Sequence, residues 1–338
     1  MRYAQLTLMF HHQPTRTVSD NSILTRQTLV EPDQPMISGL TEVNLRGGRQ
    51  GKFVWTVDGA DYTKQYLPPT ISGLEASPEL MIAQMDYVGV DRAVLQTGHI
   101  YGKLNRYLSD AVRKYPGRFW GLAMVDEWRA DHSSQFRVVD RAVNELGLHA
   151  LWFQSSNISI HGRKEKLDDS TFDEFWEYVR KLGIPVFWFV TSAKPGMSSY
   201  LAELRSFDRW LDMHPDIPVV LTHGLLLSRF IDKGSVSIPS EVWKLLDHPN
   251  VLVELLFPIF QGSDWEYPYR EAQPIVREYY ERLGAGRLVW GSDMPNVERH
   301  CTYLQSLDYL RRHCGFISVS DMSKICGGNI ADLFGGSR

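Results

Sequence analysis

The chain has 338 residues, of which 43% are hydrophobic and 22% charged, which is typical of a globular protein with one large or two small domains. Its formal net charge of -4 and its pI near 6.3 give no basic surface for a phosphate backbone, so we expect no nucleic-acid partner. No apolar run approaches the roughly 18 residues of a membrane span, and no export signal is visible, so we expect no membrane partner.

The first element is an apolar strand at about residues 3–10, within "LTLMFHHQPT". It ends abruptly in His11, His12 and Gln13, an arrangement that predicts a buried strand delivering ligands or catalytic groups to its end. Side chains alternate along a strand, so a shift of one residue would exchange His11 and His12. Which of the two faces the site is left open.

Residues 14–76 form a long segment that interrupts the pattern of elements. It contains "VNLRGGRQGKFVWTV", which predicts a hairpin turning at Gly47 and Gly48, and then the proline-stiffened "YLPPTISG". A loop of this length in a compact domain is usually functional or a subunit contact. We therefore expect either a lid over the site or an oligomer arm.

From about residue 77 the chain alternates regularly between helix and strand. In "SPELMIAQMDYVGVDRAVLQ", Ser77 can cap a helix, Pro78 suits its first position and Gly89 ends it, before the strand-like "RAVLQ". The same order returns in later segments. They are "YPGRFWGLAMV", "LGLHALWF", "LGIPVFWFV", "HPDIPVVLTHG", "HPNVLVELLF" and "GAGRLVWGSD".

With the opening strand, this makes eight apolar strands alternating with amphipathic helices. Such strands predict a parallel sheet covered by helices, and eight units close naturally into a (βα)8 TIM barrel forming one domain over residues 1–338. A doubly wound open sheet is the alternative, but no G-x-G-x-x-G turn follows the first strand.

Active sites of such barrels lie at the carboxyl ends of the strands, where polar side chains follow several apolar runs. His223 ends "VVLTHG", and Asp293 follows "LVWGS", where burial of a carboxylate is costly unless a cation or hydrogen-bond donors meet it. A satisfied core histidine and a helix-capping aspartate are the structural alternatives. His99, Trp152 and Trp188 also lie at strand ends. Glu254 lies inside "VLVELLF", and we favour a structural role for it.

The ordered segments "IAQMDYVGVDRAVLQ", "NRYLSDAVRKYPGRFWGLAMV", "PVVLTHG", "RLVWGSDMPN" and "ICGGNIADLFG" resemble the amidohydrolase-related enzymes. The likeness extends from about residue 80 to the C-terminus. It is to the branch that holds aminocarboxymuconate-semialdehyde decarboxylase and the resorcylate and hydroxybenzoate decarboxylases. The segment "GRQGKFVWTVDGADY" resembles the insertion of the decarboxylase subgroup. The resemblance implies a (βα)8 barrel, in agreement with the repeat.

In that family one divalent metal is held by an H-x-H or E-x-H pair after strand one, a histidine after strand five and an aspartate after strand eight. A strand-six histidine is either a ligand or the acid/base. By resemblance His11, His223 and Asp293 match, whereas Gln13 and Phe189 replace two usual ligands. A glutamine carbonyl suits magnesium or manganese better than zinc. We therefore favour a site that is metal-free or holds zinc, manganese or magnesium weakly, with a tightly bound catalytic zinc as the alternative.

Three hypotheses follow from the resemblance. We favour a cytoplasmic non-oxidative decarboxylase of a small carboxylated aromatic or muconate-type acid, with His223, Asp293 and His11 as catalytic residues. Arg16, His99, Trp152 and Trp188 would bind the substrate, although Arg16 could equally be a solvated loop residue and the tryptophans core residues. The alternatives are hydrolysis of a lactone, ester or C–C bond, and a non-catalytic ligand-binding descendant. Relatives are commonly homodimers or homotetramers.

Three cysteines, Cys301, Cys314 and Cys326, are spread over the C-terminal part of the chain without C-x-x-C spacing. An odd number of separated cysteines is typical of reduced, structural thiols and agrees with the expected cytoplasmic location.

Overall fold

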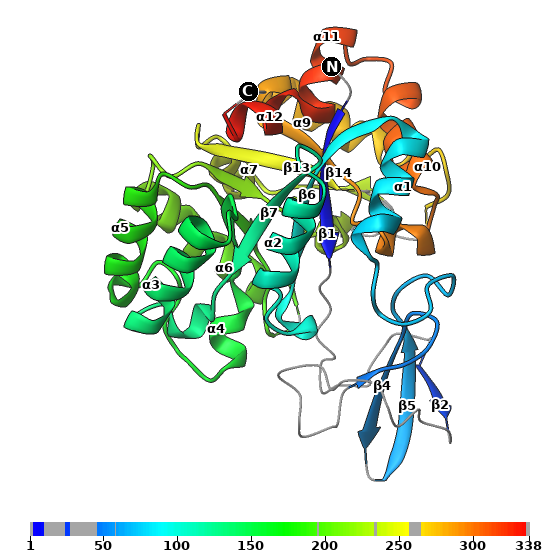
Figure 1. The fold of residues 1–338 in the computed structure, drawn as a ribbon. Helices are drawn as coiled ribbons and strands as arrows, with labels where there is room; N and C mark the ends of the chain where they lie inside the picture. The colour runs from blue at the N-terminus through cyan, green and yellow to red at the C-terminus, as the bar shows by residue number, and fades with distance from the viewer. Residues whose placement is uncertain are drawn as a thin grey trace.

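The computed structural model describes residues 3–9, 24–27, 46–57, 59–194, 196–232, 235–256 and 265–335. Eight strands pair in parallel and close into a barrel in the order β1-β14-β13-β10-β9-β8-β7-β6 (Figure 1). They are β1 (Tyr3–Met9), β6 (Val90–Thr97), β7 (Phe119–Met124), β8 (Ala150–Gln154), β9 (Val186–Phe189), β10 (Val219–Leu221), β13 (Val251–Leu256) and β14 (Leu288–Gly291). Because β1 pairs with both β14 and β6, the barrel prediction is confirmed and the open sheet is excluded.

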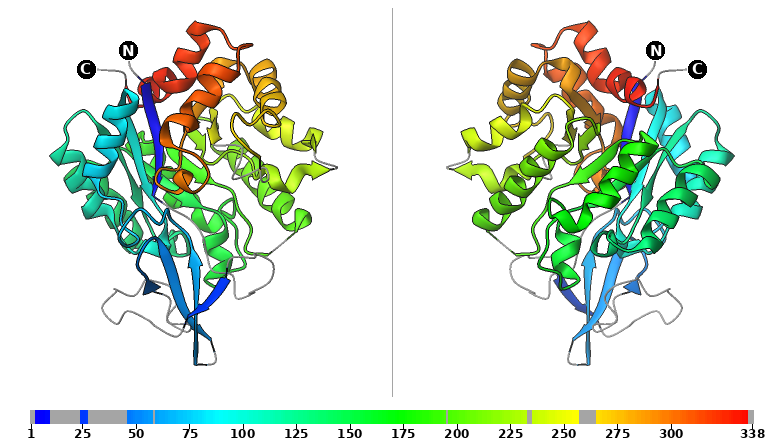
Figure 2. Two further views of the ribbon diagram at one scale, coloured as in Figure 1. Left: turned by 90° about the vertical axis from the view of Figure 1, so that its right-hand side faces the viewer. Right: turned by 90° about the vertical axis from the view of Figure 1, so that its left-hand side faces the viewer.

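Helices surround the barrel and cover its outer face (Figures 1 and 2). The longer ones are α1 (Pro78–Val88), α2 (Asn105–Lys114), α3 (Ser133–Asp140), α5 (Asp173–Leu182), α6 (Met197–Met213), α7 (Ser240–Leu246), α9 (Gln273–Leu283) and α10 (Tyr303–His313). Shorter ones are α4 (Ser156–Ile160), α11 (Val319–Ser323) and α12 (Asn329–Leu333).

The ends of α1 show why this repeat is readable in the sequence. Ser77 Oγ accepts a hydrogen bond from the Leu80 N–H at 3.3 Å, and Pro78 occupies the first helical turn. Gly89 ends the helix with φ of 81°, a left-handed conformation that glycine adopts without steric cost. The start and end predicted for this helix are confirmed.

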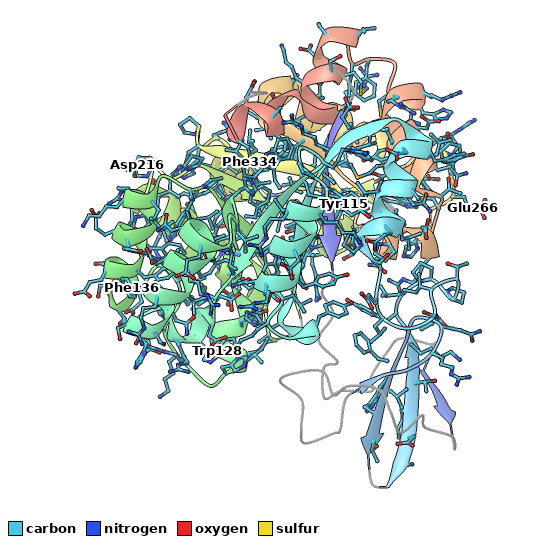
Figure 3. The ribbon with its side chains drawn as sticks, viewed as in Figure 1. Tyr115, Trp128, Phe136, Asp216, Glu266 and Phe334 are labelled. Carbon is cyan, nitrogen blue, oxygen red and sulfur yellow. The ribbon has the colours of Figure 1, made fainter. Side chains whose placement is uncertain are left out.

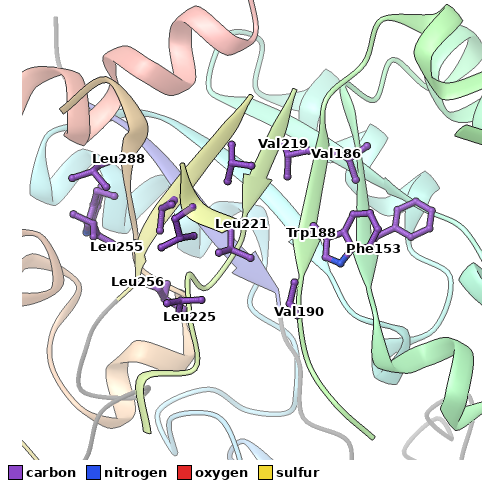
Figure 4. Packing of buried hydrophobic residues seen from close by; sticks show 14 of the residues in the cluster. Phe153, Val186, Trp188, Val190, Val219, Leu221, Leu225, Leu255, Leu256 and Leu288 are labelled. Carbon is purple, nitrogen blue, oxygen red and sulfur yellow. The ribbon is translucent and has the colours of Figure 1, made fainter. Parts of the chain in front are cut away.

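Alternate residues of each strand face two different cores. The outer core lies between strands and helices, and Figure 4 shows part of it around Trp188 and Phe153. The inner core fills the barrel, where each large apolar side chain contributes about 1.5–3 kcal/mol on burial. Its buried members are Val94, Trp120, Leu122, Met124, Ala150, Trp152, Phe187, Phe189, Val220, Val289 and Ile330.

The C-terminal segment closes the amino end of the barrel. The Phe334 ring stacks on Trp120 with centroids 5.0 Å apart and on Phe187 at 6.0 Å. The Asn329 amide donates to the carbonyls of Ala285 and Leu288, both at 2.7 Å, and so fastens α12 to the start of β14. The site must therefore open at the other end. Figure 3 shows Phe334 and Trp128 towards opposite ends of the barrel.

The long segment after β1 forms a separate four-stranded antiparallel sheet in the order β2-β5-β4-β3. Its strands are β2 (Leu24–Gln27), β3 (Arg46–Gly47), β4 (Lys52–Val57) and β5 (Ala60–Gln65). Gly47 is still part of β3, where it pairs with Phe53 of β4. The predicted turn therefore lies slightly later, at Gly48 to Gly51. Gly51 has φ of 72°, and a Cβ there would lie 2.4 Å from the Leu67 carbonyl oxygen, so only glycine fits this turn.

The small sheet projects beyond the end of the barrel towards which β1 runs. Both chain termini lie at the opposite end (Figures 1 and 2). Its base packs against the barrel through an aromatic group. The Phe53 ring lies 4.6 Å from Tyr66 and 6.3 Å from Tyr101, which follows β6. The position fits the predicted lid or arm, and the choice between them stays a prediction.

Cys301, Cys314 and Cys326 are buried and form no disulfide, in agreement with the sequence. Among the described residues every helix is too short or too polar to cross a bilayer.

Candidate active site

His223 and Asp293 each lie two residues beyond the end of a barrel strand, β10 and β14 respectively. The strand between these two is β13, which carries Glu254. The three side chains therefore come from three consecutive strands at the carboxyl end of the barrel. All three are almost fully buried, with exposed fractions of 4%, 2% and 2% for His223, Asp293 and Glu254.

Both strand-end residues have a left-handed backbone, with φ of 64° at His223 and 54° at Asp293. Such values are uncommon for residues other than glycine and cluster at functional sites. At His223 the turn continues into Gly224, where a Cβ would lie 2.5 Å from the Glu254 carbonyl oxygen. The backbone of β13 therefore packs directly against this turn.

The His223 imidazole lies in apolar surroundings. Its ring centroid is 4.1 Å from that of Phe189. Neither ring nitrogen has a hydrogen-bond partner within the described part of the chain. Burial lowers the pKa of His223 to about 3, so in these surroundings the ring is neutral.

Asp293 is held by the turn that follows it. Its Oδ2 accepts a hydrogen bond from the Asn296 amide at 2.8 Å, and its backbone carbonyl accepts from the Val297 N–H at 3.0 Å. Within the described residues Oδ1 has no partner. Burial raises the pKa of Asp293 well above its usual value, while the Asn296 hydrogen bond and the charge of Arg299 act in the opposite direction.

Glu254, for which the sequence predicted a structural role, lies on the strand between those that precede His223 and Asp293. Its Oε2 accepts hydrogen bonds from the Thr222 hydroxyl at 2.9 Å and from the His223 N–H at 2.5 Å. Thr222 also bonds to the Gln96 side chain, from β6 on the far side of the barrel. Burial raises the pKa of Glu254 to about 8. Glu254, Thr222 and Gln96 thus form a chain of buried, hydrogen-bonded side chains across the barrel interior, next to His223.

Gly291 in β14 makes room for this carboxylate, because a Cβ at Gly291 would lie 1.7 Å from Glu254 Oε1. The signal in the sequence was a lone carboxylate inside an apolar strand together with a glycine near the end of "RLVWGSD". Strand register, which a single sequence does not give, was needed to connect them.

A second group of polar residues lies at the ends of β6 and β7. His99, predicted to bind substrate, is in the short helix η2 (His99–Tyr101) after β6. Its Nε2 lies 2.6 Å from Oε2 of Glu127, in η3 (Glu127–Arg129) after β7. Glu127 was not identified from the sequence, although it follows the apolar residues 119–125 with only Asp126 between them.

The two tryptophans predicted to bind substrate face opposite sides of the barrel wall. Trp152 belongs to the inner core, and its ring lies 6.3 Å from that of His99. Trp188 belongs to the outer core (Figure 4). Its ring centroid lies 4.6 Å from that of Trp210 and 5.7 Å from that of Trp176. The predicted pocket role of Trp188 therefore does not fit its position in the helix layer.

Comparison with known proteins supports the resemblance seen in the motifs. A family model described as Amidohydrolase matches residues 64–336. This chain belongs to the amidohydrolase family.

Solved structures with the same fold share little sequence with this amidohydrolase. A probable 2-pyrone-4,6-dicarboxylic acid hydrolase from Acinetobacter baumannii is 19% identical, with a TM-score of 0.59 over 77% of this chain and 90% of that one. A dihydroxybenzoic acid decarboxylase from Polaromonas sp. JS666, with bound manganese and the inhibitor 2-nitroresorcinol, is 17% identical, with a TM-score of 0.56 over 77% and 86%.

A third structure, an apo protein from Agrobacterium tumefaciens, is 14% identical with a TM-score of 0.60, and the match covers 100% of this chain and 97% of that one. At these identities the three structures establish the fold.

Of the residues predicted to bind a metal, His223 and Asp293 belong to the described part of the chain. His11, His12, Gln13 and Arg16 lie outside the described residues. Within the described ranges no group of three or more histidine, cysteine, aspartate or glutamate side chains is arranged to hold a metal ion. Phe189, beside His223, offers a phenyl ring at the strand-five ligand position. His223 and Asp293 alone do not complete a metal site, and we derive no chemical step through a metal.

The amidohydrolase site is bordered on the side of the four-stranded sheet by Tyr66, Tyr101 and Arg299. The guanidinium carbon of Arg299 lies 5.6 Å from the Tyr66 ring centroid, and an Arg299 nitrogen donates to the Gln65 carbonyl at 3.5 Å. Burial raises the pKa of both tyrosines, and the charge of Asp293 adds to the shift. Residues at the base of the sheet thus lie close enough to Asp293 to feel its charge.

Proposed function

We propose that this amidohydrolase is a non-oxidative decarboxylase of a small carboxylated aromatic or muconate-type acid. The observation that carries the proposal is the burial of His223, Glu254 and Asp293 on, or two residues beyond, three consecutive barrel strands, beside an aromatic barrel interior. The manganese-bound dihydroxybenzoic acid decarboxylase shares this fold and supports the choice of reaction.

Decarboxylation of such an acid requires one proton. The bond between the ring carbon and the carboxylate carbon breaks, its electron pair stays on the ring carbon, and that carbon takes a proton while carbon dioxide leaves. In our proposal His223 and Asp293 hold and transfer this proton, and His11 is the third catalytic residue. Trp152 and Phe189 are inner-core aromatics that would contact the ring.

His99 would bind the substrate groups from the other side of the opening, and Arg16 is proposed to bind them as well. We retain a divalent metal such as manganese, zinc or magnesium as a possible cofactor of the proposed enzyme, because a relative with this fold binds manganese. Its third ligand would have to come from the segment after β1.

Hydrolysis of a lactone, ester or C–C bond is the second candidate, favoured by the fold shared with the probable 2-pyrone-4,6-dicarboxylic acid hydrolase. Product analysis separates the two reactions. Purified protein is incubated with 2,6-dihydroxybenzoate, 5-carboxyvanillate and 2-pyrone-4,6-dicarboxylate in ¹⁸O-labelled water. Carbon dioxide with an unlabelled phenol supports decarboxylation, and ¹⁸O in a ring-opened acid supports hydrolysis. Ligand binding without turnover of any compound supports a non-catalytic descendant.

The proposal includes the four-stranded sheet as a lid over the site, because at its base Phe53 lies beside Tyr101 and Tyr66 lies beside Arg299. A subunit arm in a homodimer or homotetramer is the other role that its position allows. Light scattering on size-exclusion fractions gives the oligomeric state. Hydrogen exchange of residues 46–76 with and without 2,6-dihydroxybenzoate tests the lid, since a lid gains protection only with ligand. The buried, unpaired cysteines support a cytoplasmic location.

A further inference from the structure

His99 and Glu127 form a close histidine–carboxylate pair at the mouth of the barrel. Their Nε2 and Oε2 atoms are 2.6 Å apart, which is short for a hydrogen bond and typical of one with an ionised partner. The Glu127 side chain is completely buried, whereas that of His99 keeps 13% of its surface exposed. The pair is thus anchored inside the protein and presents its imidazole outward.

Glu127 is fixed by more than the imidazole. Its Oε1 accepts hydrogen bonds from the backbone N–H of Gln154 at 3.2 Å and from the Asn157 amide at 3.1 Å. These donors belong to β8 and to α4, so three neighbouring segments meet at one carboxylate. Because Oε1 already has two donors, the contact of Oε2 with His99 determines where the imidazole lies and how its charge is balanced.

The His99 ring lies over the β6–β8 side of the barrel interior. Its centroid is 6.3 Å from that of Trp152, an inner-core residue, and 5.0 Å from that of Trp128. His223 and Asp293 instead come from β10 and β14, on the other side of the opening. A flat ligand above Trp152 would therefore have His99 at one end and the His223–Asp293 side at the other.

The charges around His99 favour its protonated form. Burial alone lowers the pKa of His99, but the adjacent Glu127 carboxylate and the nearby Asp126 more than offset this, so the pKa is raised above 6.5. Lys103 opposes the shift, and it forms an ion pair with Asp126 at 2.9 Å while remaining largely exposed. The carboxylates beside His99 thus favour a positively charged imidazole at the mouth of the barrel.

We propose that His99 is a substrate-binding imidazolium, positioned by Glu127, that receives a carboxylate or phenolate oxygen of the aromatic acid. This inference rests on the proposed function for the class of substrate and adds the group that orients it. A hydrogen bond between an imidazolium and an oxyanion is charge-assisted and about twice as strong as a neutral one. Glu127 acts through His99 and is a positioning residue.

The first test needs no substrate. The His99 Cε1–H resonance, assigned by its absence in His99→Gln, is titrated by NMR in the wild type and in Glu127→Gln. Removing the carboxylate charge is expected to lower the pKa of His99. An unchanged pKa in Glu127→Gln would overturn the positioning role. His99→Gln keeps an amide donor for Glu127, so it leaves the binding test available if Glu127→Gln does not fold.

A matched control is present elsewhere in the chain. His248 Nε2 lies 3.0 Å from Oδ1 of Asp208, so this is a second histidine–carboxylate pair. His248 precedes β13 and therefore lies at the amino end of the barrel, away from the mouth. Asp208→Asn removes the same kind of charge and is expected to leave both the His99 resonance and ligand binding unchanged.

The second test measures dissociation constants by calorimetry for 2,6-dihydroxybenzoate and for 2-nitroresorcinol, which lacks the carboxylate. Loss of one charge-assisted hydrogen bond predicts about tenfold weaker binding in both His99→Gln and Glu127→Gln. If only 2,6-dihydroxybenzoate is affected, His99 receives the carboxylate; if both are affected, it receives a phenolate. Equal affinities in all variants, or no binding of either compound to the wild type, would overturn the oxyanion assignment. The carbon dioxide assay judges the proposed reaction independently.

Discussion

The carboxylate of Glu254 accepts a hydrogen bond from the backbone N–H of His223 at 2.5 Å. The same oxygen accepts from the Thr222 hydroxyl, so one buried side chain of β13 binds the two residues that directly follow β10. His223 has a left-handed backbone at this point, and Glu254 is therefore part of what fixes the direction of its imidazole.

Replacing Glu254 by alanine should destabilise the fold. It leaves the His223 N–H without its acceptor and removes one of the two acceptors that the Thr222 hydroxyl has, and a buried unsatisfied group costs about 1–3 kcal/mol. We expect the free energy of unfolding to fall by about 3 kcal/mol in urea titrations. Glu254→Gln keeps an acceptor oxygen and should lose less. Glu241→Ala, at an exposed helix position, is the control and should change stability by less than about 0.5 kcal/mol. Equal stability of Glu254→Ala and wild type would contradict this role.

Gly291→Ala should destabilise the barrel through the same carboxylate. The new Cβ would lie 1.7 Å from Glu254 Oε1, so the glutamate must leave its place, and such overpacking costs about 1–3 kcal/mol or more. In the double variant with Glu254→Ala the clash is absent. The two effects should therefore be strongly non-additive in a double-mutant cycle. Gly286→Ala, where a Cβ meets nothing within 4 Å, is the matched control. Additive effects would show that the two positions do not interact.

The sequence predicted the barrel well because each βα unit carries local signals, such as the cap at Ser77 and the left-handed Gly89. It also predicted that His223 and Asp293 closely follow two of the barrel strands. It did not predict the Glu254–His223 or His99–Glu127 contacts, because these depend on which strands are neighbours and on their register. The predicted pocket position of Trp188 was wrong for a related reason. Side chains alternate between the two faces of a strand, and the outer layer of this barrel is also aromatic, so residue type did not tell which face Trp188 is on.

Asp293→Asn should separate chemistry from folding. Residue 293 has φ of 54°, and asparagine is among the few residues that tolerate the left-handed conformation. We therefore expect a melting temperature close to that of the wild type. With the substrate identified by the carbon dioxide assay, turnover should fall by at least about 100-fold, as expected for loss of a proton-transfer group. Asp293→Ala should lose stability as well. Wild-type turnover in Asp293→Asn would exclude a catalytic aspartate.

Phe189→His should increase metal affinity. The Phe189 ring lies 4.1 Å from that of His223, so an imidazole at position 189 could share an ion with His223 and Asp293. Three protein ligands are what a catalytic zinc site normally requires. We expect manganese or zinc to bind at least about tenfold more tightly than to the wild type in calorimetry. Phe187→His, two residues earlier on the same strand, is the control. No gain in Phe189→His would show that His223 and Asp293 do not converge on one ion.

His99 should make the stability of the protein depend on pH. Its pKa in the folded protein is raised by Glu127 above the value of about 6.5 expected in the unfolded chain, so the folded state holds the proton more tightly. The resulting stabilisation is fully present below pH 6.5 and is lost as the pH rises through the folded pKa. The difference in unfolding free energy between wild type and His99→Gln, measured from pH 5.5 to 9, should therefore be largest at the acid end. A pH-independent difference for His99→Gln would mean that the imidazole contributes packing alone.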